Sequence, residues 1–191
     1  MTTRAGDGLA EVIYLPGVAA PARVAVPHET GPAARTRAEN IAMHALTRRG
    51  RSRRELEALL TARELDPQTI ELELERLAGV GLLDDDALAE QIVRTQRERK
   101  GLGRAAIVAE LKRRKLAPEA IDAALSEIGD DEQERATALA VQRAARLQGL
   151  DRETAVRRLT GFLQRKGYSG DSVREAVDTA LAERTRTVRF R

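Results

Sequence analysis

Apolar residues recur at spacings of three and four from about residue 37 to 183, a pattern typical of helices with one buried face. In the first stretch Ile41, Ala42 and Ala45 lead to Gly50, where the pattern is interrupted. Ser52 then has the residue type of a helix N-cap, and Pro67 suits the first turn of a helix, where its missing N–H has no partner to lose. The pattern predicts helices over 37–49, 52–63, 67–80, 86–99, 103–115, 118–128, 131–147, 151–167 and 170–183.

The same pattern occurs three times along the chain. An offset of 51 residues carries apolar, Gly and Pro positions of the first copy onto the second: Gly50 to Gly101, Leu56 to Ile107, Leu60 to Leu111, Leu65 to Leu116, Pro67 to Pro118, Ile70 to Ile121, Leu74 to Leu125 and Leu77 to Ile128. An offset of 52 carries the second copy onto a weaker third: Ile107 to Leu159, Leu111 to Leu163, Leu116 to Tyr168, Ile121 to Val173 and Leu125 to Val177. Self-similarity at a fixed period is the mark of a repeat protein.

A single unit of about 45 residues without an aromatic core is marginally stable, so neighbouring units are expected to stack. The fold class we predict is all-α, an elongated array of three tandem three-helix repeats, each resembling a helix-turn-helix, with a flexible N-terminal arm. The arm contains four of the six prolines and no sustained period. The predicted divisions are an arm over 1–35, repeats over 36–83, 84–129 and 130–183, and a basic C-terminal tail over 184–191.

Composition excludes several classes of protein. The absence of Cys excludes disulfides, thiolate nucleophiles and cysteine metal sites. No stretch approaches 18 consecutive apolar residues, so we expect a cytoplasmic protein without membrane association. The formal net charge of +3 lies entirely in residues 130–191, so a nucleic-acid interpretation depends on local patches of charge.

Three consecutive aspartates, Asp84, Asp85 and Asp86, are the first candidate for chemistry. A cation site would need further oxygen or imidazole ligands, and only Glu90 is close in sequence, whereas one aspartate as N-cap and two near the positive end of the 86–99 helix explain the pattern. The two histidines have no ligand partners at metal-site spacing. The segment KGLG over 100–103 lacks the Gly-Lys-Ser/Thr ending of a phosphate loop. We therefore expect no enzyme activity, no cofactor and no metal.

Charge differs between the helices of a unit. The second helices, 52–63, 103–115 and 151–166, carry 13 basic and five acidic residues, whereas the third helices, 67–80, 118–128 and 170–183, carry two basic and ten acidic ones. Lysine and arginine near helix C-termini on solvated faces would explain part of this bias. The other interpretation is a surface matched to a partner whose own potential alternates, such as a protein filament that carries DNA.

Direct reading of DNA by a helix-turn-helix is the competing hypothesis, since the second and third helices of each unit form such a pair. The helix that would enter the major groove is the acidic one, which would face phosphates at an electrostatic cost. Stacking of single-stranded bases also fits poorly, because the helical region offers only Phe162 and Tyr168.

The string GLLDDDALAEQIVRTQRERKGLGRAAIVAEL over 81–111, preceded by RSRRELEALL and followed by FLQRKGYSGDSVREAV over 162–177, resembles the RecX family of bacterial RecA regulators. The Gly-Leu-Leu-Asp-Asp segment is the most specific part. The chain departs from the family pattern at Leu88, where Phe is usual, and at Lys115 and Glu64, where Gly is common.

The resemblance implies tandem three-helix repeats and a regulator that binds along the groove of the RecA–DNA filament. Such a regulator restrains ATP hydrolysis, strand exchange and co-protease activity, and so moderates recombination and the SOS response. The partners expected are the RecA filament and the DNA in it, with weak direct DNA binding as an addition, and we expect a monomer. A DNA-binding helical-repeat protein that acts directly on nucleic acid is the alternative function.

The resemblance and the charge pattern nominate two sets of residues. The family signature at the joint between the first two repeats comprises Gly81, Leu82, Asp84, Asp85, Ala89 and Glu90. The candidate contacts to the filament or DNA are Arg53, Arg54, Arg104, Lys112, Arg113, Arg114, Arg157, Arg158, Arg165 and Lys166.

Overall fold

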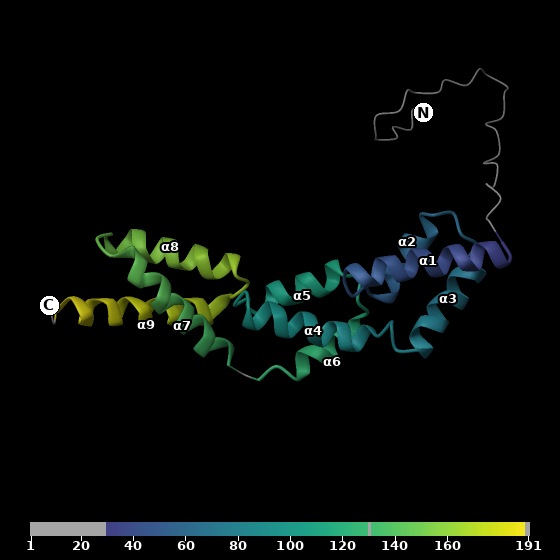
Figure 1. The fold of residues 1–191 in the computed structure, drawn as a ribbon. Helices are drawn as coiled ribbons and strands as arrows, with labels where there is room; N and C mark the ends of the chain where they lie inside the picture. Colours follow the sequence, from purple (N-terminus) through teal and green to yellow (C-terminus); the bar gives the residue numbers. More distant parts are fainter. Residues whose placement is uncertain (1–29, 130, 190–191) are drawn as a thin grey trace, which may run out of the picture.

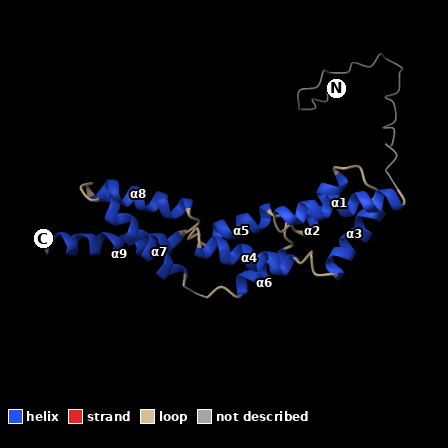
Figure 2. Cartoon of the chain, viewed as in Figure 1, coloured by secondary structure: helices blue, strands red, loops and turns tan. Residues whose placement is uncertain are grey.

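The computed structural model describes residues 30–129 and 131–189, with side chains as far as Glu183. These residues form helices joined by loops (Figure 2), so the predicted all-α class is confirmed. The predicted flexible arm lies outside the described residues as far as Glu29.

The first unit consists of α1 (Pro32–Arg48), α2 (Arg53–Thr61) and α3 (Pro67–Gly79). The Ser52 hydroxyl caps α2 by accepting from the Glu55 N–H at 3.1 Å, and the Glu55 carboxylate accepts from the Ser52 N–H at 3.3 Å. Asp66 caps α3 by accepting from the Thr69 N–H at 2.9 Å. The buried face of α1 carries only alanines, while the other helices and the loops after them supply the larger side chains of the core, Leu56, Leu60, Leu65, Ile70, Leu74, Leu77 and Leu83.

The second unit consists of α4 (Asp85–Glu98), α5 (Arg104–Arg113) and α6 (Pro118–Ser126). Its core contains aliphatic residues at the positions that the 51-residue offset predicts, including Ile107, Leu111, Leu116, Ile121 and Leu125. Pro118 occupies the first turn of α6, as Pro67 does in α3.

The third unit consists of α7 (Glu132–Ala144), a single 3₁₀ turn (Ala145–Leu147), α8 (Arg152–Arg165) and α9 (Gly170–Arg189). Alanines on α7 and α9, among them Ala136, Ala140 and Ala176, are completely buried. Tyr168 fills the position that Leu65 and Leu116 take in the other units and is 2% exposed.

Each unit has its own core cluster. The three units follow one another in a row, with α1 to α3 at one end and α7 to α9 at the other (Figure 1). The predicted elongated array of three tandem three-helix repeats is therefore confirmed.

Two predicted boundaries were wrong. α1 begins at Pro32, inside the segment predicted as an arm, because a proline is compatible with the first helical turn and Ala33 and Ala34 continue the helix. α9 continues to Arg189 instead of ending at residue 183, since TRTVR over 185–189 contains neither Gly nor Pro to stop it. The segment predicted as a basic tail is thus helical as far as Arg189.

Candidate interaction surface

The second helices of the three units meet end to end. The Ser52 hydroxyl at the start of α2 donates to the carbonyl of Arg114, which follows α5, at 2.6 Å. At the next joint, the Gly103 N–H at the start of α5 donates to the carbonyl of Lys166, which follows α8, at 2.8 Å. Each contact brings the negative end of one helix dipole to the positive end of the next. The helices α2, α5 and α8 therefore form one head-to-tail row, the "second-helix row".

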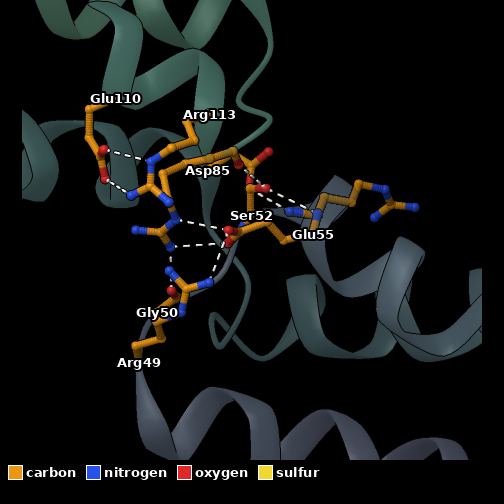
Figure 3. Close-up of polar contacts among 9 residues, drawn as sticks. Arg49, Gly50, Ser52, Glu55, Asp85, Glu110 and Arg113 are labelled. Carbon is orange, nitrogen blue, oxygen red and sulfur yellow. Dashed lines mark hydrogen bonds and ion pairs between the residues drawn. The ribbon is translucent and has the colours of Figure 1, made fainter. Parts of the chain in front are cut away.

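Gly50, Ser52 and Glu55 lie close together at the joint between the first two units (Figure 3), and Arg114 forms hydrogen bonds with all three. Its guanidinium donates to Glu55 Oε1 at 2.9 Å, to Glu55 Oε2 at 3.1 Å and to the Gly50 carbonyl at 2.6 Å. The residue is only 7% exposed. Arg114 was predicted as a filament or DNA contact, but this burial makes it a structural residue of the joint.

The carboxylate of Glu55 is shared by several donors. Burial acts to raise the pKa of Glu55, but the hydrogen bonds and charge of Arg114, the Ser52 N–H and the charge of Arg49 together outweigh burial and hold the pKa below its ordinary value. Arg49 lies 3.2 Å from Oε1. Glu55 is therefore ionised at neutral pH and holds the two units together as an anion.

The aspartates that begin α4 divide between two tasks. Asp84 is the N-cap of α4 and accepts from the Ala87 N–H at 2.9 Å. Asp85 instead accepts from the Arg53 N–H, at the first residue of α2, at 2.8 Å. Burial, with the neighbouring charges of Asp86 and Asp84, raises the pKa of Asp85 despite the Arg53 N–H and the Arg53 charge. The sequence predicted a helix start at the joint between the first two repeats, but it gives no local signal for the hydrogen bond from the Arg53 N–H of the preceding unit to Asp85.

Of the other signature residues, Gly81 and Leu82 form the turn before α4, and Ala89 and Glu90 lie on α4 itself. Gly81 has a φ of +72°, and its N–H donates to the Ala78 carbonyl while the Leu82 N–H donates to the Leu77 carbonyl. This Schellman turn ends α3 and needs a residue with positive φ. Leu82 is 49% exposed, Ala89 is buried in the core of the second unit, and Glu90 is exposed on α4.

The joint between the second and third units uses equivalent positions. Lys166, which the 52-residue offset aligns with Arg114, donates through Nζ to the Lys100 carbonyl. The Tyr168 hydroxyl donates to the Gly101 carbonyl at 3.4 Å, and burial is the main cause that raises the pKa of Tyr168. A Cβ on Gly103 would lie 2.7 Å from the backbone of Gly167, so only glycine permits this approach. Lys166 was predicted as a contact to the filament or DNA, and in the structure its ammonium forms a hydrogen bond at this joint.

Lys115 and Glu64 have φ values of +56° and +62° and align with Gly167, whose φ is +87°. The resemblance to the RecX family marked Glu64 and Lys115 as positions where glycine is common. The structure gives the physical reason, because all three follow a second helix and adopt the left-handed conformation that glycine reaches without steric cost.

Three predicted cations meet at one groove on the second unit. Arg54, Arg104 and Lys112, together with Lys115, line a groove of about 710 Å³ between α5 and α6. Lys115 was not among the candidate contacts. It lies three residues after Lys112, a spacing that places side chains on the same face of a helix, and this spacing could have indicated it.

The remaining predicted contacts differ in their surroundings. Arg53 lies 2.6 Å from Glu71 of α3, and Arg113 pairs with Glu110 one turn earlier on α5 at 2.5 Å. The predicted contacts on α8, Arg157, Arg158 and Arg165, are exposed but do not line this groove. The second-helix row therefore carries exposed cations in each unit, and those that line the groove come from the first two units.

Within residues 30–129 and 131–189, no cluster of His, Asp or Glu side chains is arranged to hold a metal ion. Over the same residues, no helix is both long and apolar enough to cross a membrane.

Together these features define a class of protein, a tandem three-helix repeat protein with cations exposed along a row of joined helices. The family model for the second three-helix domain of RecX matches residues 84–125, and the model for the third three-helix domain matches residues 130–177. The "Regulatory protein RecX" of Streptomyces coelicolor is 38% identical over 148 residues, which cover 76% of this chain and 78% of that one. The "Regulatory protein RecX" of Thermobifida fusca is 39% identical over 135 residues, which cover 70% and 72%.

The fold is also found in solved structures. The crystal structure of RecX from Lactobacillus salivarius superimposes with a TM-score of 0.68 at 22% identity, covering 78% of this chain and 97% of that chain. A second crystal structure, of regulatory protein RecX, has a TM-score of 0.65 at 23% identity. The chain belongs to the RecX family, and its role is that of a RecX-type regulatory protein.

Proposed function

We propose that this chain binds along the RecA–DNA filament and restrains its ATP hydrolysis, strand exchange and co-protease activity. By doing so it moderates recombination and the SOS response. Membership of the RecX family supports this proposal.

The single observation that carries the proposal is the second-helix row. Its three helices are joined end to end by hydrogen bonds, so exposed cations recur along the long axis of the array. A polymeric partner presents the same charges again at each protomer, and an elongated array with recurring cations can contact more than one protomer at once. Such a contact would couple neighbouring protomers and oppose the changes that accompany ATP hydrolysis.

The direct test is a titration of the protein into RecA assembled on single-stranded DNA, with ATP hydrolysis as the measurement. We expect hydrolysis to fall as the protein approaches a stoichiometric ratio to RecA. An unchanged rate at a stoichiometric excess would refute the proposal.

Substitution of exposed cations tests the surface. Arg157→Glu with Arg158→Glu should weaken binding to the filament and leave helicity intact, because both side chains are exposed on α8. Reversal of Arg113 and Arg114, two other candidate contacts, is not a clean test, since Arg114 is buried against Glu55 and its loss would damage the joint. Undiminished binding by the α8 variant would mean that these cations are only solvated.

Direct binding to DNA is the second candidate function. The observation in its favour is the group of exposed cations at the groove between α5 and α6. Tight binding to naked single- or double-stranded DNA without RecA, falling steeply with salt, would support it. Weak or absent binding under the same conditions would leave the filament as the target.

A further inference from the structure

The groove between α5 and α6 combines charge with an aliphatic floor. Its floor is lined by Val108, Leu116, Pro118, Ile121 and Leu125. The charged side chains that line it are mainly the cations Arg54, Arg104, Lys112 and Lys115. A second groove, of about 570 Å³, shares Arg54 and Lys115 and runs along α2 past Ala58 and Thr61. The two grooves thus meet at these cations.

Several of these cations have no acidic partner. Among the described residues, Arg54, Lys112 and Lys115 form no ion pair, in contrast to Arg53 and Arg113, which pair with carboxylates. Asp122 is the only acidic residue that lines the larger groove. The groove therefore presents unbalanced positive charge at its edge and apolar surface on its floor.

This combination matches one kind of occupant. A polypeptide segment that carries both carboxylates and aliphatic side chains can neutralise the cations and bury its apolar side chains on the floor. A nucleic-acid strand would use the cations alone, because no aromatic side chain lines the groove to stack on its bases. We propose that the groove between α5 and α6 binds an acidic, aliphatic segment of the protein subunit of the filament. This inference rests on the proposed function, because the filament is what brings the segment to the groove.

Photo-crosslinking on the full chain identifies the occupant. A benzophenone amino acid replaces Asp122, which is exposed at the groove, and a control chain carries it at Arg94, which is exposed on α4 and lies outside the groove. After irradiation on RecA filaments, mass spectrometry should find a crosslink from position 122 to a RecA segment containing carboxylates and aliphatic residues, with none from position 94 to that segment. A crosslink to DNA, or to a RecA segment without carboxylates, would overturn the inference.

Two sets of variants separate charge from apolar contact. Lys112→Glu with Lys115→Glu should raise the concentration needed to half-inhibit RecA ATP hydrolysis by roughly tenfold. Val108→Asn should raise it as well, since Val108 is part of the floor. The matched controls are Arg94→Glu, another exposed cation without an ion pair among the described residues, and Val156→Asn, another partly buried valine on a second helix. Circular dichroism and thermal melting check the fold of each variant. The variant with Lys112→Glu and Lys115→Glu changes only exposed residues, so it stays informative even if Val108→Asn proves unstable.

The outcomes distinguish failure of the inference from failure of the proposed function. If the wild type inhibits ATP hydrolysis but neither groove variant changes the inhibition, the groove is not the docking site and the proposed function stands. If charge reversal weakens inhibition and a stably folded Val108→Asn does not, a polyanion such as DNA occupies the groove and the inference is wrong. If the wild type has no effect on RecA, the proposed function fails first, and the inference falls with it.

Discussion

Replacement of Arg114 by Met should lower the free energy of unfolding and make the unfolding of the first two units less cooperative. The change removes the guanidinium but keeps most of the apolar stem, so it isolates the three hydrogen bonds to Glu55 and Gly50. The side chains of Arg114 and Glu55 are 9% and 10% exposed, so water replaces the lost donors poorly.

The expected cost follows from this burial. Removing one partner of a buried ion pair costs about 3–5 kcal/mol. Glu55 keeps the Ser52 N–H at 3.3 Å and Arg49 at 3.2 Å, which places the loss at the lower end, at about 3 kcal/mol. For a chain of this length such a loss corresponds to a fall in melting temperature of about 6–12 °C. Because each unit has its own core, we also expect the unfolding transition to broaden or divide in two.

Urea unfolding followed by circular dichroism, with calorimetry alongside, measures the effect. Arg113→Met is the matched control, since Arg113 is the preceding residue, is 66% exposed and pairs only with Glu110 on its own helix. It should cost less than about 0.5 kcal/mol. A double-mutant cycle with Glu55→Gln should return a coupling energy of about 2 kcal/mol. Equal stabilities of the Arg114→Met and Arg113→Met variants would refute the assignment of Arg114 to the joint.

The dependence of stability on pH gives an independent check on the pair of Arg114 and Glu55. The pKa of Glu55 is lower in the folded protein than its ordinary value of 4.5, so the stabilisation is present above pH 4.5 and is lost as the pH falls through the folded pKa. The difference in free energy of unfolding between the wild type and Arg114→Met should therefore be full at pH 7 and shrink below about pH 4.5. A difference that does not change in acid would mean that the Glu55 charge does not contribute to the joint.

Three further changes test other parts of the array by urea unfolding. Lys115→Gly should stabilise the protein by about 0.5–1 kcal/mol, because Lys115 has a positive φ that glycine adopts without steric cost; an unchanged or lower stability would contradict this. Gly103→Ala should lower the free energy of unfolding by about 1–3 kcal/mol, because its Cβ would lie 2.7 Å from the backbone of Gly167 in the next unit. The control Gly79→Ala has no atom within 4 Å of the new Cβ and should be neutral or stabilising, so equal effects of the two substitutions would refute the close approach. Asp85→Asn should keep an acceptor for the Arg53 N–H and remove a carboxylate whose pKa is raised, so that its stability relative to the wild type improves as the pH rises above 3.8; a fall instead would show that the charge itself is needed. Asp85→Ala loses the hydrogen bond and should be less stable than Asp85→Asn at every pH, and equal stabilities would show that this hydrogen bond does not stabilise the joint.

Within each unit, the sequence was sufficient to predict the helices, apart from two boundaries, and the repeated core positions. The constant offset placed Leu65, Leu116 and Tyr168 at one core position, and the family resemblance marked Glu64 and Lys115 as positions where glycine is common, which the structure explains by their positive φ. These features depend on residues close along the chain, where helical periodicity and capping chemistry fix the geometry.

Only the tertiary structure decided how the units join and which cations remain on the surface. Lys112 lies on the last turn of α5 and Arg114 directly follows this helix, yet Arg114 is buried against Glu55 whereas Lys112 lines the groove. The burial of Arg114 depends on Gly50 and Glu55, about 60 residues earlier in the chain, and the contact of Asp85 with Arg53 also crosses the joint. Charge and helical period give the type and the face of each side chain, but the position of the neighbouring unit determines whether that face meets protein or water.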